Sequence, residues 1–227
     1  AEALGDVLML RGRYAEAAQR LDSARTLVSG PLARARILYK EGDLGYRAGD
    51  FGVAVGSLES ALRMLGRRVP KRTVTVLASI VFQIIIQFLH SLMPRLFIAR
   101  RGLERAEEDL LVCAIYGRLT LTAILHQGML ASLRAHLCEV NLAERYPATQ
   151  ALALAYANHG VALGQLPWFG RAIRYGTRAV DVARAQGEPL TLGKALHHLG
   201  FVLQWSGRFD DALARQRESL DLLRRYG

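Results

Sequence analysis

Several stretches of this sequence have residue types suited to nucleotide or metal chemistry, but their spacing does not fit it. The run Gly187-Glu-Pro-Leu-Thr-Leu-Gly193-Lys194-Ala195 approaches a phosphate-binding loop. That loop needs four residues between its glycines and a Ser or Thr after the lysine, because the hydroxyl holds magnesium. Here five residues separate the glycines and an alanine follows the lysine. We therefore expect no nucleotide or other cofactor site.

The histidines and cysteines are also poorly spaced for a metal site. His197 and His198 are adjacent, and neighbouring side chains on a helix point about 100° apart. His136 and Cys138 are two residues apart, which is no better on a helix, and Cys113 has no matching motif. We expect these side chains to be packing or surface residues, with no metal site.

An acidic run is the remaining candidate for acid–base chemistry. Glu104, Glu107, Glu108 and Asp109 lie close together. Negative charge is favourable at a helix start because of the helix dipole, so we interpret the run as a solvated helix start. The sequence therefore predicts no catalytic residue, and any ATPase, kinase or cyclase activity would lie outside this fragment.

The composition favours a helical, cytoplasmic protein. The chain has 227 residues, 51% of them hydrophobic, and is dominated by the helix formers Ala, Leu and Arg. It has two cysteines, which fits a reducing compartment. It does not begin with Met, and we interpret it as a piece of a longer protein.

The net charge of +10 is carried mainly by arginine spread along the predicted helices. A solvated basic face is the first interpretation, and a surface for a polyanion or anionic lipid is the alternative. We expect no specific nucleic-acid binding. Residues 67–72, Arg-Arg-Val-Pro-Lys-Arg, form the one short basic cluster in the sequence.

A repeated pattern organises the chain. One large apolar residue recurs at intervals of 37, 78, 40 and 40 residues, at Tyr14, Phe51, Met129, Phe169 and Phe209. A small residue follows three positions later each time, at Ala17, Ala54, Ser132, Ala172 and Ala212. A glycine also precedes four of the five positions by nine residues, at Gly5, Gly42, Gly160 and Gly200.

Helix packing explains this pattern. A small residue lets two helices approach closely, and the large residue is expected to fill the gap between them. We predict an all-α fold, an α-solenoid of antiparallel helix pairs with a period of 37–40 residues. Residues 1–66 would form two pairs, 67–102 a hydrophobic linking helix or degenerate repeat, and 103–227 three pairs of one continuous solenoid.

The pattern resembles the tetratricopeptide (TPR) repeat. The resemblance rests on Leu4-Gly5, Gly12-Arg13-Tyr14, Ala17 and Ala24, on Gly49-Asp50-Phe51, Ala54 and Ala61, and on Leu199-Gly200, Gly207-Arg208-Phe209 and Ala212. The period exceeds the usual 34 residues, and the proline that usually closes a repeat is mostly missing, which implies longer helices or loops.

A second stretch is similar to the helical region of large bacterial signalling proteins that join kinase-like and STAND-type ATPase domains to TPR-like repeats. It comprises residues 137–147, Ala155-Tyr156 and residues 166–171. These resemblances imply a non-catalytic scaffold for protein–protein interaction, regulatory within a multidomain signalling protein. Its partner would be a protein, a peptide or another domain of the same polypeptide.

In TPR-like stacks the first helix of each pair lines the concave face. The predicted partner-binding residues are Arg36, Tyr39, Asp43, Tyr46, Arg47, Lys194, His197, Phe201, Gln204 and Trp205. Aromatics mixed with arginine are typical of protein-binding surfaces, although ordinary surface positions would look the same. Trp168 and Trp205 are expected to pack near repeat turns, with Trp205 facing a ligand as the alternative.

Residues 73–93 contain no formal charge and are flanked by basic residues on both sides. As a helix they would be roughly 30 Å long, enough for a bilayer core. The polar residues Thr75, Ser79, Gln83, Gln87 and Ser91 recur every four positions. We expect a helix buried between repeats. The alternatives are a surface helix for a membrane or self-association, which would make the chain a membrane-associated helical-repeat domain, and a transmembrane span.

Overall fold

A computed structural model describes residues 2–104 and 106–226. These residues form twelve α-helices and no strand, so the predicted all-α helical-repeat fold is confirmed. The chain divides into two compact units, residues 1–85 with 107–137 and residues 86–106 with 138–227. The predicted domain boundaries near residues 66 and 102 stay predictions.

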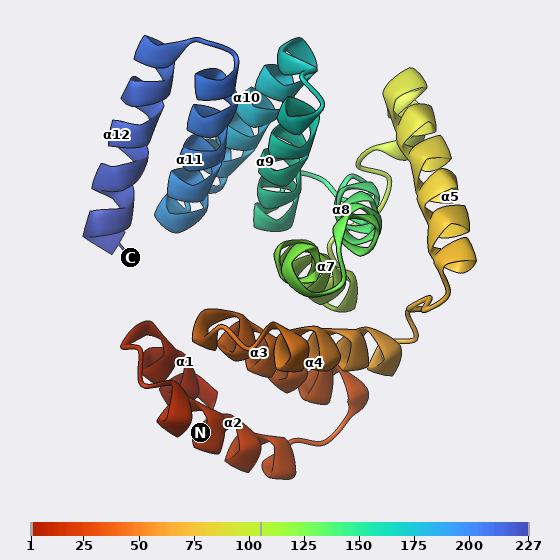
Figure 1. The fold of residues 1–227 in the computed structure, drawn as a ribbon, viewed down its shortest axis with the longest axis vertical. Coiled ribbons are helices and arrows are strands. Elements are labelled where there is room, and N and C mark those ends of the chain that lie inside the picture. The colour runs from red at the N-terminus through yellow and green to blue at the C-terminus, as the bar shows by residue number, and fades with distance from the viewer. Residues whose placement is uncertain (1, 105, 227) are drawn as a thin grey trace. The chain divides into compact units, whose positions relative to one another are not determined.

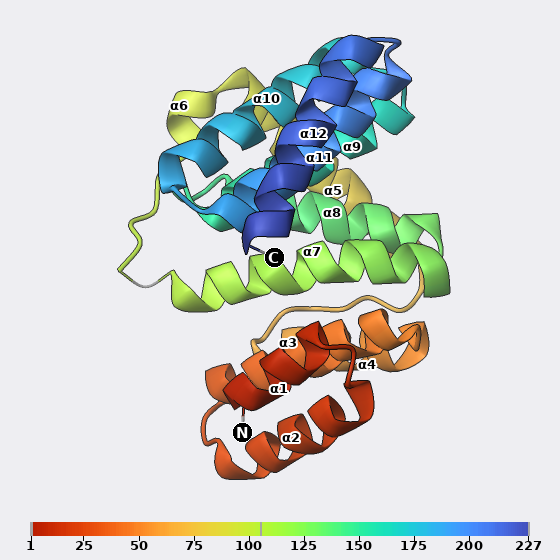
Figure 2. The same cartoon turned by 90° about the vertical axis from the view of Figure 1, so that its left-hand side faces the viewer.

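The first unit is built from helix pairs. Its helices are α1 (Glu2–Leu10), α2 (Tyr14–Leu27), α3 (Pro31–Ala48), α4 (Phe51–Met64) and α7 (Glu107–His126), with the first parts of α5 (Thr73–Leu92) and α8 (Met129–Ala143). Helices α1, α2 and α3 each pack on the next helix, and α7 packs against α3 and α4 (Figure 2). Leu8, Met9 and Leu44 join Ala17 and Leu21 in its N-terminal core.

The second unit repeats this arrangement. It holds the ends of α5 and α8, the short α6 (Pro94–Phe97), and α9 (Gln150–Gln165), α10 (Phe169–Gln186), α11 (Pro189–Trp205) and α12 (Phe209–Tyr226). Helices α9 to α12 pack in sequence, and α11 also packs directly on α9 (Figure 1). The first helices of these two pairs are therefore neighbours.

The structure confirms the repeat positions. The five large residues Tyr14, Phe51, Met129, Phe169 and Phe209 are the first residues of α2, α4, α8, α10 and α12. The small residue three positions later is buried in all five cases. Gly49 and Gly207 lie two residues before their helices with φ of 81° and 80°, a left-handed conformation that glycine adopts without strain.

The glycines of the first helices allow close helix contact, as predicted. At Gly42 an added Cβ would lie 2.6 Å from Leu58 Cγ. At Gly160 it would lie 3.0 Å from the carbonyl oxygen of Ala172 and 3.2 Å from the nitrogen of Gly176. Helices α9 and α10 therefore touch through their backbones, and a larger residue at position 160 would separate them.

The predicted gap-filling role of the large residue is wrong at two of the five positions. Met129 and Phe209 are 72% and 68% exposed. A side chain in the first turn of a helix points toward the N-terminal end of that helix. At these two positions it therefore extends past the end of the helix pair and into solvent.

The expectation that residues 73–93 form a buried helix is also wrong. Helix α5 covers residues 73–92, and only 11% of its most apolar stretch is buried. By length and composition α5 and α7 are both apolar enough to cross a membrane, among the residues that the structure describes. Helix α7 is 44% buried over its own most apolar stretch, as a core helix would be. Of these two apolar helices, α5 is therefore the one that is mostly exposed.

Candidate partner-binding site

The five predicted residues of α3 lie along one side of that helix, and α7 engages three of them. Arg36 forms an ion pair with Glu107. Asp43 pairs with Arg118 of α7 and, at 2.8 Å, with Arg47. The Arg118 guanidinium also lies 4.7 Å from the centre of the Tyr46 ring.

The remaining α3 residues are held by the same arrangement. Tyr39 is half-buried, and its burial raises the pKa of its hydroxyl, partly offset by the charge of Arg118. Arg47 is exposed at the helix end. The electrostatic contacts of this face therefore join α3 to α7 within the first unit. This use was not visible in the sequence, because it depends on which helix packs against α3.

The five predicted residues of α11 lie in the second unit and are more open to solvent. Lys194, Gln204 and Trp205 are exposed, and His197 and Phe201 are half-buried. The His197 and Phe201 rings meet edge to face at 4.5 Å. Phe201 and Trp205 stack at 6.1 Å. Three rings thus form a ladder along α11, at spacings of four residues.

Two contacts fix this aromatic ladder. At the N-terminal end of the ladder, His197 Nδ1 lies 2.8 Å from Gln216 Oε1 of α12. At its C-terminal end, the Trp205 ring lies against Gly164 of α9, where an added Cβ would be 3.0 Å from Trp205 Cε3. The ladder therefore reaches from α12 to α9 with its rings already ordered. Such preorganisation lowers the entropic cost of binding a partner.

The adjacent His198 is a packing residue, as predicted for this histidine pair. Its burial lowers the pKa of the ring to about 4, with the nearby His197 and Lys194 acting in the same direction. Trp168 differs from the prediction, because it is 55% exposed at the α9–α10 turn. It borders an open hollow of about 560 Å³ formed by residues 167–171 and Arg174.

A buried polar cluster in the second unit was not anticipated. His90 Nδ1 of α5 lies 2.7 Å from Glu144 Oε2 of α8, and both side chains are buried. Gln87 Nε2 donates to Tyr175 Oη at 3.5 Å. Tyr156 and Tyr175 meet edge to face at 5.3 Å. Burial, followed by the charge of Glu144, raises the pKa of Tyr156.

Glu139 lies in the same unit and is also buried. Burial raises the pKa of its carboxyl group to about 8, and the hydrogen bond from Asn158 opposes the shift. Asn158 Nδ2 lies 3.1 and 3.2 Å from the two carboxylate oxygens. An isolated acidic residue in the apolar stretch 135–143 was the available signal for burial. Its partners come from other helices, so the sequence did not identify them.

A cavity of about 270 Å³ lies beside the His90–Glu144 pair. Its lining residues are Ile86, Leu89, His90, Leu96, Phe97, Arg100, Arg101 and Arg145. The chain at residues 99–101 is held by two backbone hydrogen bonds, Ala99 N to Glu144 O at 2.8 Å and Arg101 N to Arg145 O at 2.9 Å. The cavity thus combines apolar walls with Arg100 and Arg101 of this segment and with Arg145, which follows α8.

Three of the four acidic residues lie at a helix start, as expected, but Asp109 is buried and therefore not solvated. Glu107, Glu108 and Asp109 lie in the first turn of α7. Arg67 pairs with Asp109 and, at 3.5 Å, with Glu108. Among the described residues, no group of three or more His, Cys, Asp or Glu side chains could hold a metal ion.

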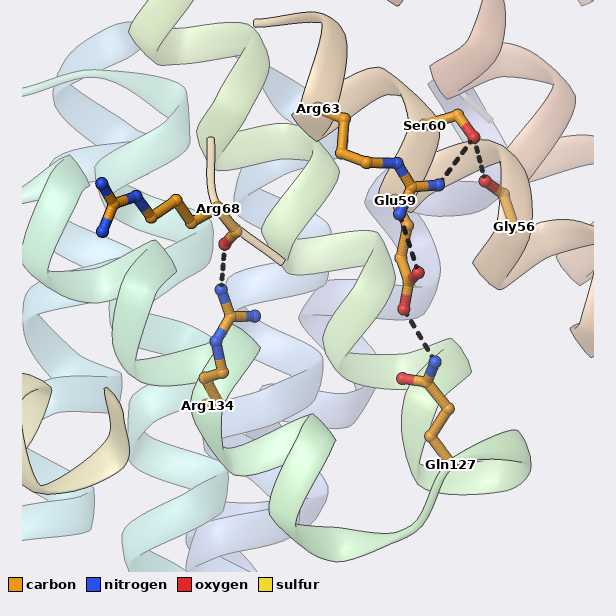
Figure 3. A network of polar contacts seen from close by, with 7 residues as sticks. All are labelled: Gly56, Glu59, Ser60, Arg63, Arg68, Gln127 and Arg134. Atoms are coloured by element: carbon orange, nitrogen blue, oxygen red, sulfur yellow. Dashed lines mark hydrogen bonds and ion pairs between the residues drawn. The ribbon is translucent and has the colours of Figure 1, made fainter. Parts of the chain in front are cut away.

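A second polar network fixes the chain that leads into α5 (Figure 3). The buried Arg134 donates from Nη2 to the backbone carbonyl of Arg68 at 2.8 Å. The Arg68 side chain extends away from this contact. Nearby, Gln127 at the α7–α8 turn donates to Glu59 of α4 at 2.8 Å. The backbone of the basic segment is held while the Arg68 side chain stays exposed.

Comparison with known proteins supports the fold and does not assign a function. Neither the protein-family models nor the curated proteins give a match to this sequence. Among solved structures, the chain is similar to BtubC (BKLC) from P. vanneervenii, with a TM-score of 0.59 and 17% sequence identity. The match covers 96% of this chain and 76% of that one. At this identity the likeness shows an all-α helical-repeat fold.

Proposed function

We propose that this chain is a non-catalytic scaffold for protein–protein interaction that uses TPR-like helix pairs. The observation that carries the proposal is the ordered aromatic ladder on α11, formed by His197, Phe201 and Trp205. Aromatic side chains held in place beside exposed polar groups are enriched at the centres of protein interfaces. Lys194 and Gln204 are the exposed polar residues of the same helix face.

The partner that fits this surface is a peptide or domain with an apolar or aromatic anchor, including another domain of the same polypeptide. The α3 face is a weaker candidate, because Arg36, Asp43 and Tyr46 already have partners on α7. Partner binding is therefore assigned first to α11. The resemblance of residues 137–171 to bacterial signalling proteins supports a regulatory role in the cytoplasm within a larger protein.

The test compares protein capture by the wild-type chain and by Trp205→Ala. Truncating a central aromatic anchor typically costs 2 kcal/mol or more of binding energy, so recovery of the bound protein should fall about thirtyfold. Phe209→Ala is the matched control, since it removes an exposed aromatic from the start of α12. Equal recovery with Trp205→Ala and wild type, at equal helicity, would contradict the proposal.

A further inference from the structure

Helix α5 turns the polar residues Gln87 and His90 of its C-terminal half inward. Its buried residues are Ile80, Gln87 and His90. Gln87 and His90 contact Tyr175 and Glu144, as described above. A helix on the surface of a water-soluble protein normally shows the opposite arrangement, with its apolar stripe inward.

The outward side of α5 is almost entirely apolar. Its exposed large residues are Val74, Leu77, Val81, Phe82, Ile84, Ile85, Phe88 and Leu92. Phe88 is the more exposed of the two phenylalanines of α5, at 63%. Exposed apolar surface of this extent on one helix marks a site that something else covers.

The charges around α5 identify the kind of surface that covers it. Between Glu59 and Glu104 the sequence has eight basic residues and no acidic one. Arg63 and Arg67 pair with acidic residues of the chain. Six of the eight lie just before or just after the helix and are exposed to solvent: Arg68, Lys71, Arg72, Arg95, Arg100 and Arg101. Apolar residues flanked by basic ones are complementary to a bilayer that contains anionic lipids.

These charges disfavour a second copy of the chain as the covering partner. Because both ends of α5 are basic, pairing two copies in either direction would place positive ends beside positive ends. Such like-charge contacts across an interface cost several kcal/mol. An anionic lipid surface gains energy from the same charges.

The cavity beside His90 lies at the C-terminal end of α5. Arg100, Arg101 and Arg145 line the cavity together with the apolar residues Leu89 and Phe97. Arginine binds phosphate oxygens through paired N–H donors. Apolar walls next to three guanidinium groups suit a phospholipid headgroup and the start of its acyl chain.

We propose that α5 lies in the surface of an anionic phospholipid membrane, with its exposed apolar side chains among the acyl chains and its basic flanks at the lipid phosphates. The helix is long enough to span a bilayer. A span would surround it with lipid and break the contacts of Gln87 and His90, whose polar groups would then lack partners in hydrocarbon. This role is additional to partner binding on α11 and does not depend on it.

Vesicle co-sedimentation of the 227-residue chain tests the proposal. The two probes are vesicles of phosphatidylcholine alone and vesicles containing about 30% phosphatidylserine, an anionic fraction large enough to attract basic segments. The chain should sediment with the anionic vesicles and be released by salt, because screening weakens the headgroup contacts. Equal binding to both vesicles, or to neither, would overturn the proposal.

Two pairs of substitutions separate the apolar and the charged contributions. Phe82→Ser with Phe88→Ser should weaken binding at least about tenfold, since each ring loses its burial in lipid. Arg72→Gln with Arg100→Gln should weaken it roughly thirtyfold, at about 1 kcal/mol for each charge removed. The matched controls are Leu10→Ser with Leu27→Ser and Arg20→Gln with Arg217→Gln, which change exposed residues elsewhere and should bind as wild type does.

Sedimentation velocity without lipid measures the oligomeric state of the chain. A monomer at micromolar concentration is expected, with the helicity of all variants unchanged by circular dichroism. A dimer that Phe82→Ser with Phe88→Ser converts to monomer would show that a second copy covers α5, which would overturn the membrane proposal.

Discussion

At the residue scale, Glu139 links the stability of the fold to pH. Its carboxyl group keeps a proton up to about pH 8 in the folded chain, whereas in the unfolded chain the pKa is 4.5. Between these values the folded state holds one more proton, so raising the pH lowers the free energy of unfolding. The buried His136 acts at lower pH: its pKa falls from 6.5 to about 4, so stability drops as the pH falls through that range.

The interval from pH 6.5 to 8 therefore isolates Glu139. We predict that the free energy of unfolding of the wild type falls by about 2 kcal/mol across it. Glu139→Gln, which has no proton to lose, should flatten this dependence. Urea unfolding, monitored by circular dichroism at several pH values, measures the free energy of unfolding of the wild type and of Glu139→Gln. Asp221→Asn, at an exposed position, is the control. The same slope in wild type and Glu139→Gln would show that Glu139 is ionised in the folded chain.

Gly160 tests the close contact of α9 and α10. We predict that Gly160→Ala destabilises the chain by roughly 1–3 kcal/mol, because the added Cβ meets the backbone of Ala172 and Gly176. Gly170→Ala in the first turn of α10 is the control, since nothing lies within 4 Å of its added Cβ. It should be neutral or slightly stabilising. The midpoints of thermal unfolding of the variants and the wild type measure these effects. A Gly160→Ala variant as stable as the wild type would contradict the close contact of α9 and α10.

At the element scale, the helix pairs were predictable and the orientation of α5 was not. The starts of α4 and α12 follow from Gly49-Asp50-Phe51 and Gly207-Arg208-Phe209, because a left-handed glycine ends one helix and the next begins two residues on. These signals are local. The direction in which α5 turns its polar side depends on Glu144 and Tyr175, which are distant in the sequence.

The same limit applies to the candidate site. The aromatic ladder on α11 follows from a spacing of four residues within one helix. The predicted binding residues of α3 instead form ion pairs with α7. These pairs depend on Glu107 and Arg118, which are distant in the sequence from Arg36 and Asp43. Sequence periodicity gives the faces of a helix but not the helix that packs on each.

Arg134 provides a test of how the segment before α5 is held. We predict that Arg134→Met speeds amide hydrogen exchange in residues 66–72, because the Arg68 carbonyl loses a charged donor worth roughly 1.5–3 kcal/mol. Arg63→Met is the control, since its contacts are separate from the Arg134–Arg68 bond (Figure 3). Its pair with Glu59 joins residues four apart on one helix and is partly exposed, so its loss should matter little. Unchanged amide exchange in Arg134→Met would show that Arg134 does not hold residues 66–72 in place.

At the scale of the whole molecule, both units have a core of helix pairs, and the second unit also has exposed aromatic residues that this core does not bury. These residues include Trp205 of the aromatic ladder of α11, whose rings are ordered by Gln216 and Gly164. Trp205 packs on Gly164 with one part of its ring, but packing does not explain why 42% of this residue is exposed beside Phe201. In the proposed function these residues bind the protein partner.

The most direct measurement of that role is photo-crosslinking in cells, with a photoreactive phenylalanine analogue placed at position 205 or at position 209 of the chain. Both native residues are exposed aromatics, on α11 and α12 respectively. The partner-binding account predicts a discrete crosslinked product from position 205 and none from position 209. Products from position 209 alone, or the same products from both, would contradict it.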